Sequence, residues 1–150
     1  LSFETRITSD TASLHSLVAE MLAASPSIHV LRDPTRGGVA STLNELAAQS
    51  ATGIELEEDA IPMDEEVRGA CEILGFDPLY VANEGKLIAA GPATDADAVL
   101  AAMRAHPLGA RAACIGRVVS DHARTVTMRS SIGSIRIVDM LSGEQLPRIC

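Results

Sequence analysis

Helix and strand signals alternate along this chain of 150 residues, and the alternation constrains its fold more than any other feature. Apolar residues recur at helical spacing in four stretches, at 14–22, 39–47, 67–74 and 99–103. Short runs typical of strands lie between them, at 27–33, 53–58 and 86–91. Ser9, Asp10 and Thr11 are possible caps of the first helix. This order predicts an α+β domain in which helices cover a mixed β-sheet.

The last third of the chain is richer in strand signals. Three short runs separated by turn residues are typical of a β-meander and lie at 113–120, 125–129 and 134–139. After Met140 the periodicity stops, and too few apolar residues remain to pack against a core. We therefore predict one domain over 1–141 and a flexible tail over 142–150.

Composition and charge exclude several classes of function. Twelve basic residues against 20 acidic ones give a formal charge of -8. Such a surface repels a phosphate backbone, so nucleic acid is not an expected partner. No apolar run approaches the roughly 20 residues of a membrane span, and no signal peptide opens the chain. We expect a cytoplasmic protein with no membrane partner. Because the chain opens with Leu1 rather than Met, we also expect that an N-terminal partner domain is missing.

The three cysteines do not suggest a disulfide scaffold or a metal site, because their number is odd and their spacing is not that of metal ligands. Cys71, on a predicted helix, and Cys114, on a predicted strand, are interpreted as small buried hydrophobic residues. Cys150 is the last residue and needs another explanation. Counted from Ser142, an extended tail could carry a group bound to its thiol over on the order of 30 Å. A terminal cysteine without any function is the alternative.

The first candidate site is the run RDPTRGG at 32–38, between a predicted strand and a predicted helix. Helix N-termini leave backbone N–H groups unpaired and suit phosphate, and glycines allow it to approach closely. Arg36 could add a charge-assisted bond, while Asp33 could hold a divalent metal or order the loop. The candidate cofactor-binding residues are Asp33, Thr35, Arg36, Gly37 and Gly38. An ordinary turn in which Asp33 caps the helix remains an equal alternative, because the spacing fits no established phosphate motif.

The second candidate site is the run VANEGK at 81–86, a polar turn directly before an apolar strand. A loop that feeds a buried strand is well fixed, which suits a catalytic carboxylate such as Glu84. A solvated turn, with residues chosen for its geometry, is the competing interpretation.

Together these runs resemble the hydrogenase expression/formation family HypE over essentially the whole chain. The segments that carry the resemblance are LRDPTRGGVASTLNELA, CEILGFDPLYVANEGKL, HPLGARAACIGRV and the terminal GEQLPRIC. The family is similar to aminoimidazole ribonucleotide synthetase, selenophosphate synthetase and thiamine-monophosphate kinase. In that group an N-terminal domain supplies most of the ATP site and dimerises, and a C-terminal α+β domain closes over it. The resemblance implies this C-terminal fold, with α/β/α layers, and a homodimer of the full-length protein.

The resemblance also implies an activity, the synthesis of the cyanide ligand of [NiFe]-hydrogenase. The carbamoyltransferase HypF places a carbamoyl group on the thiol of Cys150. ATP, with Mg²⁺ held mainly by the missing N-terminal domain, drives its dehydration to a thiocyanate, with Glu84 as the base. The nitrile then passes to the iron-carrying HypC–HypD complex. We expect the 150-residue chain to be inactive by itself.

Two other functions remain open. An ATP-dependent kinase or synthetase of the same superfamily, acting on a free small molecule, would not need the terminal thiol. A non-catalytic docking module would only present cargo bound to the cysteine.

Overall fold

The computed structural model describes residues 9–140, in which helices and strands alternate as predicted. The α-helices are α1 (His15–Ala24), α2 (Gly38–Ser50), α3 (Glu65–Leu74) and α4 (Ala96–Ala105). The strands are β1 (Val30–Arg32), β2 (Gly53–Glu57), β3 (Ile88–Ala90), β4 (Gly116–Val119), β5 (Val126–Arg129) and β6 (Ile135–Ile137). Short 3-10 turns connect them, including Pro78–Tyr80 before the VANEGK run.

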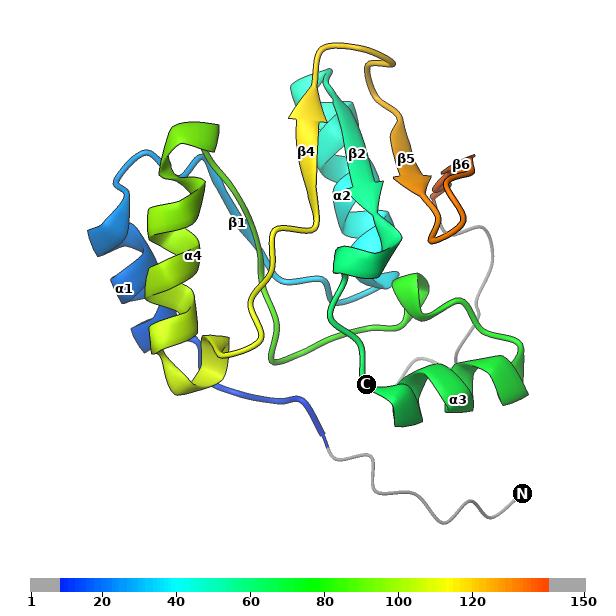
Figure 1. Cartoon of the computed structure of the whole chain (residues 1–150), viewed down its shortest axis with the longest axis horizontal. Helices are drawn as coiled ribbons and strands as arrows, with labels where there is room; N and C mark the ends of the chain where they lie inside the picture. The colour runs from blue at the N-terminus through cyan, green and yellow to red at the C-terminus, as the bar shows by residue number, and fades with distance from the viewer. Residues whose placement is uncertain (1–8, 141–150) are drawn as a thin grey trace.

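The larger sheet is mixed, in agreement with the predicted α+β class. Its strand order is β4-β2-β5-β6, and β2 pairs with β5 in parallel while the other pairs are antiparallel. Helix α2 covers one face of this sheet (Figure 1). Ala40, Leu43 and Ala47 of α2 form a buried cluster with alternate residues of the two central strands. Because successive side chains of a strand point to opposite faces of the sheet, Leu56 and Met128 lie in this core and Glu55 lies on the opposite face.

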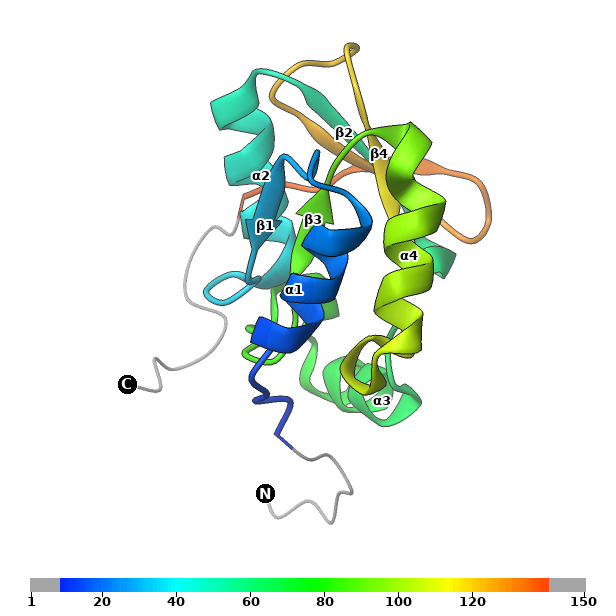
Figure 2. The same cartoon turned by 90° about the vertical axis from the view of Figure 1, so that its left-hand side faces the viewer.

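A second layer lies beside the sheet. Strands β1 and β3 pair antiparallel, with Val30 opposite Ala90. Helices α1 and α4 lie side by side against this small sheet (Figure 2). Leu17 and Met21 of α1 are buried there, which follows from their spacing of one helical turn.

The predicted β-meander is wrong. The three strands exist, but β2 lies between β4 and β5, so only β5 and β6 are consecutive neighbours. A period of two reveals which residues share a face of a strand and carries no information about the neighbouring strand. The parallel pairing of β2 with β5 is long-range, with Ile54 opposite Val126.

The predicted tail, 142–150, and Cys150 lie outside the described residues. Within 9–140, no helix combines the length and the hydropathy needed to cross a bilayer.

Candidate functional site

The RDPTRGG run forms the connection between β1 and α2. Arg32 ends the strand, and Gly37 and Gly38 open the helix with φ angles of 73° and 61°. Only glycine adopts such angles without strain, so the diglycine permits this abrupt entry into the helix. The N–H of Gly38 donates to the carbonyl of Thr35 at 3.0 Å and closes the turn. This amide is therefore engaged within the turn, which leaves Gly37 as the stronger amide candidate for a phosphate.

Gly38 has a second role, because it brings α2 against the segment that leads into the VANEGK run. A Cβ atom at Gly38 would lie 2.6 Å from the carbonyl oxygen of Val81. No real side chain tolerates such a contact with backbone, so only glycine allows this approach.

A hydrogen bond joins the two candidate runs directly. The N–H of Asn83 donates to the carbonyl of Pro34 at 3.0 Å, and its side-chain amide donates to the carbonyl of Val81 at 2.9 Å. Pro34 is buried, so this junction is fixed from both sides. Two runs nearly 50 residues apart in the sequence thereby form one surface.

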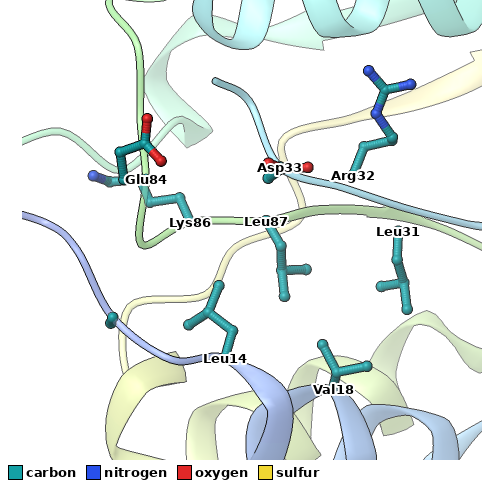
Figure 3. A pocket seen from close by; sticks show the side chains of 9 residues that line it. Leu14, Val18, Leu31, Arg32, Asp33, Glu84, Lys86 and Leu87 are labelled. Atoms are coloured by element: carbon teal, nitrogen blue, oxygen red, sulfur yellow. The ribbon is translucent and has the colours of Figure 1, made fainter. Parts of the chain in front are cut away.

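A pocket of about 290 Å³ lies at this junction. Both Asp33 and Glu84 line it, and both side chains are exposed. The apolar side of the pocket is formed by Ala12, Leu14, Val18, Leu31 and Leu87. Figure 3 shows Leu31 and Leu87 turned toward Leu14 and Val18. Arg32 and Glu84 project to the other side of the strands. The pocket thus has an apolar wall and a charged rim.

The other predicted ligands lie beside the pocket instead of lining it. Arg36 is exposed, Gly38 is buried, and Thr35 and Gly37 are half-buried. None of the four belongs to the residues that line the pocket. They form the turn and the helix N-terminus next to Asp33.

Both cations of the pocket are already paired with carboxylates. Arg32 contacts Glu45 of α2 at 2.9 Å. Lys86 contacts Asp10 at 2.7 Å, and the same oxygen of Asp10 accepts the N–H of Glu84 at 3.3 Å. Burial raises the pKa of Asp10, but the hydrogen bond and charge of Lys86, with the Glu84 amide, outweigh it and hold that pKa below its ordinary value.

Sequence reasoning missed this role of Asp10. The residue was expected as a helix cap, but α1 has Leu14 at its N-cap and no side-chain capping bond. The cap interpretation is therefore wrong, because the carboxylate is used by a turn 74 residues away. The sequence offered one hint of another role, because Asp10 lies four residues before the first apolar position of the predicted helix.

The described residues do not assemble a metal site. Between residues 9 and 140, no group of three or more His, Cys, Asp or Glu side chains could hold a metal ion. Asp33 supplies a single carboxylate, which is too few ligands for a Mg²⁺ site formed by this chain alone.

Comparison with known proteins identifies the domain. The model of the family "AIR synthase related protein, C-terminal domain" matches residues 3–129. The chain belongs to this family. The chain is also similar to two proteins named carbamoyl dehydratase HypE. It is 61% identical over 150 residues to that of Cupriavidus necator and 63% identical over 150 residues to that of Azotobacter vinelandii. All of the chain is covered, but only 43% and 44% of those relatives.

Solved structures agree with this family and fold. A crystal structure of the hydrogenase maturation protein HypE matches with a TM-score of 0.93 and 49% sequence identity. The match covers all of this chain and 49% of the length of the HypE chain. A structure of HypE in complex with ATP matches all of the chain and 46% of its own, with a TM-score of 0.92 and 48% identity. A HypE–HypF complex matches 93% of the chain and 45% of its own, with a TM-score of 0.87 and 41% identity.

Proposed function

We propose that this chain is the C-terminal domain of an ATP-dependent carbamoyl dehydratase that acts in [NiFe]-hydrogenase maturation. The observation that carries the proposal is the junction of the two candidate runs. Asp33 and Glu84 line one pocket, and the bond from Asn83 to Pro34 holds their turns together. Identity of 61–63% over all 150 residues to proteins named carbamoyl dehydratase supports it.

The proposed reaction converts a carbamoyl group on the thiol of Cys150 into a nitrile. The amide oxygen is a very poor leaving group, so it first attacks the terminal phosphate of ATP. The carbon–oxygen bond then breaks with loss of phosphate, and the two nitrogen protons are removed to complete the C≡N bond. The products are thiocyanate-bearing cysteine, ADP and phosphate, with the oxygen leaving on phosphate.

Glu84 is our candidate for the base that accepts a nitrogen proton. Its side chain is exposed at the rim of the pocket, and its backbone is fixed by Asp10. A carboxylate whose backbone is held and whose side chain is open to solvent is suited to accept a proton from a substrate bound beside it. Asp33, Thr35, Arg36 and Gly37 form the adjacent turn, where the N-terminus of α2 favours phosphate.

The remaining parts of the proposal concern the longer protein. Residues 1–141 would form a domain that closes an ATP site, and 142–150 a flexible tail that delivers Cys150. A preceding domain would hold most of the ATP and Mg²⁺ and form a homodimer. The partners would be the carbamoyltransferase HypF, which forms a complex with HypE in a solved structure, and an iron-carrying HypC–HypD complex, all in the cytoplasm. A HypE structure in complex with ATP supports the nucleotide.

Two variants of the full-length protein test the proposal by intact-protein mass spectrometry. Cys150→Ala should carry no carbamoyl group. Glu84→Gln should be carbamoylated normally but lose water at least about 100-fold more slowly, because removal of a positioned base costs 10²–10⁴ in rate. Glu66→Gln, an exposed glutamate of α3 outside the pocket, is the matched control and should behave as wild type.

The outcomes separate the alternatives. Nitrile formation in Cys150→Ala at any other group would contradict the proposal, and unchanged ATP turnover in that variant would favour a kinase of a free small molecule. A docking module would present a carbamoylated Cys150 that never loses water, even in the wild-type protein with ATP.

A further inference from the structure

The N-terminal segment before α1 lies against the turn that carries Glu84. Asp10 contacts two successive parts of that turn through one oxygen, Oδ2, which accepts from Lys86 Nζ at 2.7 Å and from the Glu84 N–H at 3.3 Å. Ala12 and Leu14 of the same segment line the pocket. The segment is therefore a wall of the candidate site, and Asp10 attaches it to the turn.

Gly85 shows how closely the two segments fit. A Cβ atom there would lie 2.6 Å from the carbonyl carbon of Asp10 and 2.9 Å from the amide nitrogen of Ala12. Both contacts are with backbone, which cannot move aside as the end of a side chain could. The glycine of the VANEGK run is thus required by the approach of Asp10, a reason that the sequence alone did not reveal.

The ion pair between Asp10 and Lys86 also controls where the positive charge of Lys86 lies. Lys86 follows Glu84 by two residues and lines the same pocket, so an ammonium released from Asp10 would lie in the neighbourhood of the Glu84 carboxylate. In Figure 3 the ends of the two side chains diverge, with the Glu84 carboxylate pointing up and the Lys86 ammonium to the left. A cation beside a carboxylate stabilises the charged form and weakens the carboxylate as a base. In the structure the Lys86 ammonium is paired with the Asp10 carboxylate.

We propose that Asp10 is a positioning residue for Glu84, which fixes the backbone of the turn and holds the ammonium of Lys86 away from the base. The inference rests on the proposed function of Glu84 and deepens it. Asp10 touches no reacting atom and acts through the turn alone. Burial raises the pKa of Asp10, but the hydrogen bond and charge of Lys86 and the Glu84 amide together hold it below its ordinary value.

The test is the pH dependence of water loss from the carbamoylated full-length protein in a single turnover. Asp10→Asn keeps an oxygen that can accept the Glu84 N–H but removes the negative charge that holds the Lys86 ammonium. We expect the rate at neutral pH to fall roughly tenfold, the effect of about one pKa unit. The acidic limb of the rate profile should move to lower pH, with little change in the KM for ATP. Asp10→Asn/Lys86→Gln, which removes the released charge, should return that limb to the wild-type position.

Asp77→Asn is the matched control. Asp77 also accepts one cation, Arg136 at 3.0 Å, and one backbone N–H, that of Leu79 at 2.9 Å, and its side chain is 31% exposed against 33% for Asp10. It lies outside the pocket of Glu84, so the acidic limb should not move.

Three results would overturn the inference. They are a wild-type profile in Asp10→Asn, a lower rate with an unmoved acidic limb, and a double variant that behaves like the single one. Glu84→Gln, measured in parallel, separates the two proposals. If it loses water normally, the role of Glu84 fails and that of Asp10 with it. If it is arrested while Asp10→Asn is normal, only the role of Asp10 fails.

Discussion

Two cysteines of the described region have opposite surroundings. Cys71 of α3 is 6% exposed and lines a smaller pocket of about 190 Å³, whereas Cys114 is exposed just before β4. Burial raises the pKa of the Cys71 thiol, and the negative charge of Asp77 raises it further. Since the thiolate is the nucleophile, Cys71 should be the less reactive of the two.

We therefore predict that iodoacetamide at pH 8 alkylates Cys71 several times more slowly than Cys114. Peptide mass spectrometry after timed quenching measures the two rates in one sample. In urea the difference should disappear, because it originates in the folded environment. Equal rates in the native protein would contradict the burial of Cys71.

The cysteines also show what a residue pattern can and cannot predict. Burial of Cys71 was predicted correctly from its place on the apolar face of a helix. Burial of Cys114 was predicted from a strand expected at 113–120, and this was wrong, because the strand begins only at Gly116. Strand ends are weakly specified by local sequence, and a shift of two or three residues decides whether a side chain belongs to the sheet.

At the scale of elements, the contact between α2 and the segment 79–81 depends on Gly38. We predict that Gly38→Ala destabilises the protein more than Gly75→Ala, although both glycines have positive φ, 61° and 72°. Alanine at Gly75 meets nothing within 4 Å and suffers only backbone strain, about 1–2 kcal/mol. Alanine at Gly38 would also clash with backbone carbonyls, which should add about 1–3 kcal/mol. Urea denaturation of the two variants measures the difference, and equal losses of stability would show that the approach at Gly38 is loose.

The elements themselves were largely predictable, whereas their pairing was not. Four helices and the strands between them follow from local periodicity, and each is present near its expected position. The insertion of β2 between β4 and β5 is decided by contacts between residues some 70 positions apart, such as Glu55 with Thr127. The junction of the two candidate runs is of the same kind. The motifs indicated both turns, but only the fold shows that Asn83 bonds to Pro34.

At the scale of the whole molecule, charge limits what the chain can bind alone. The formal charge is -8, and the two cations that line the larger pocket, Arg32 and Lys86, are each paired with a carboxylate. A triphosphate therefore meets little uncompensated positive charge there, and an N-terminus such as that of α2 contributes only about 0.3–1 kcal/mol at an exposed site. The site needs further cations, which our proposal assigns to a preceding domain.

We therefore predict that the 150-residue chain binds ATP with a Kd no tighter than about 1 mM, which corresponds to a binding free energy of about -4 kcal/mol. Isothermal titration calorimetry measures this directly, with the full-length protein as the positive control. The weakness should originate in missing cations and not in misfolding, so circular dichroism must show the helices intact in the same sample. Micromolar binding by the isolated chain would mean that its own turn at Gly37, with Arg36 beside it, suffices for the phosphates, and the division of the ATP site between two domains would then be wrong.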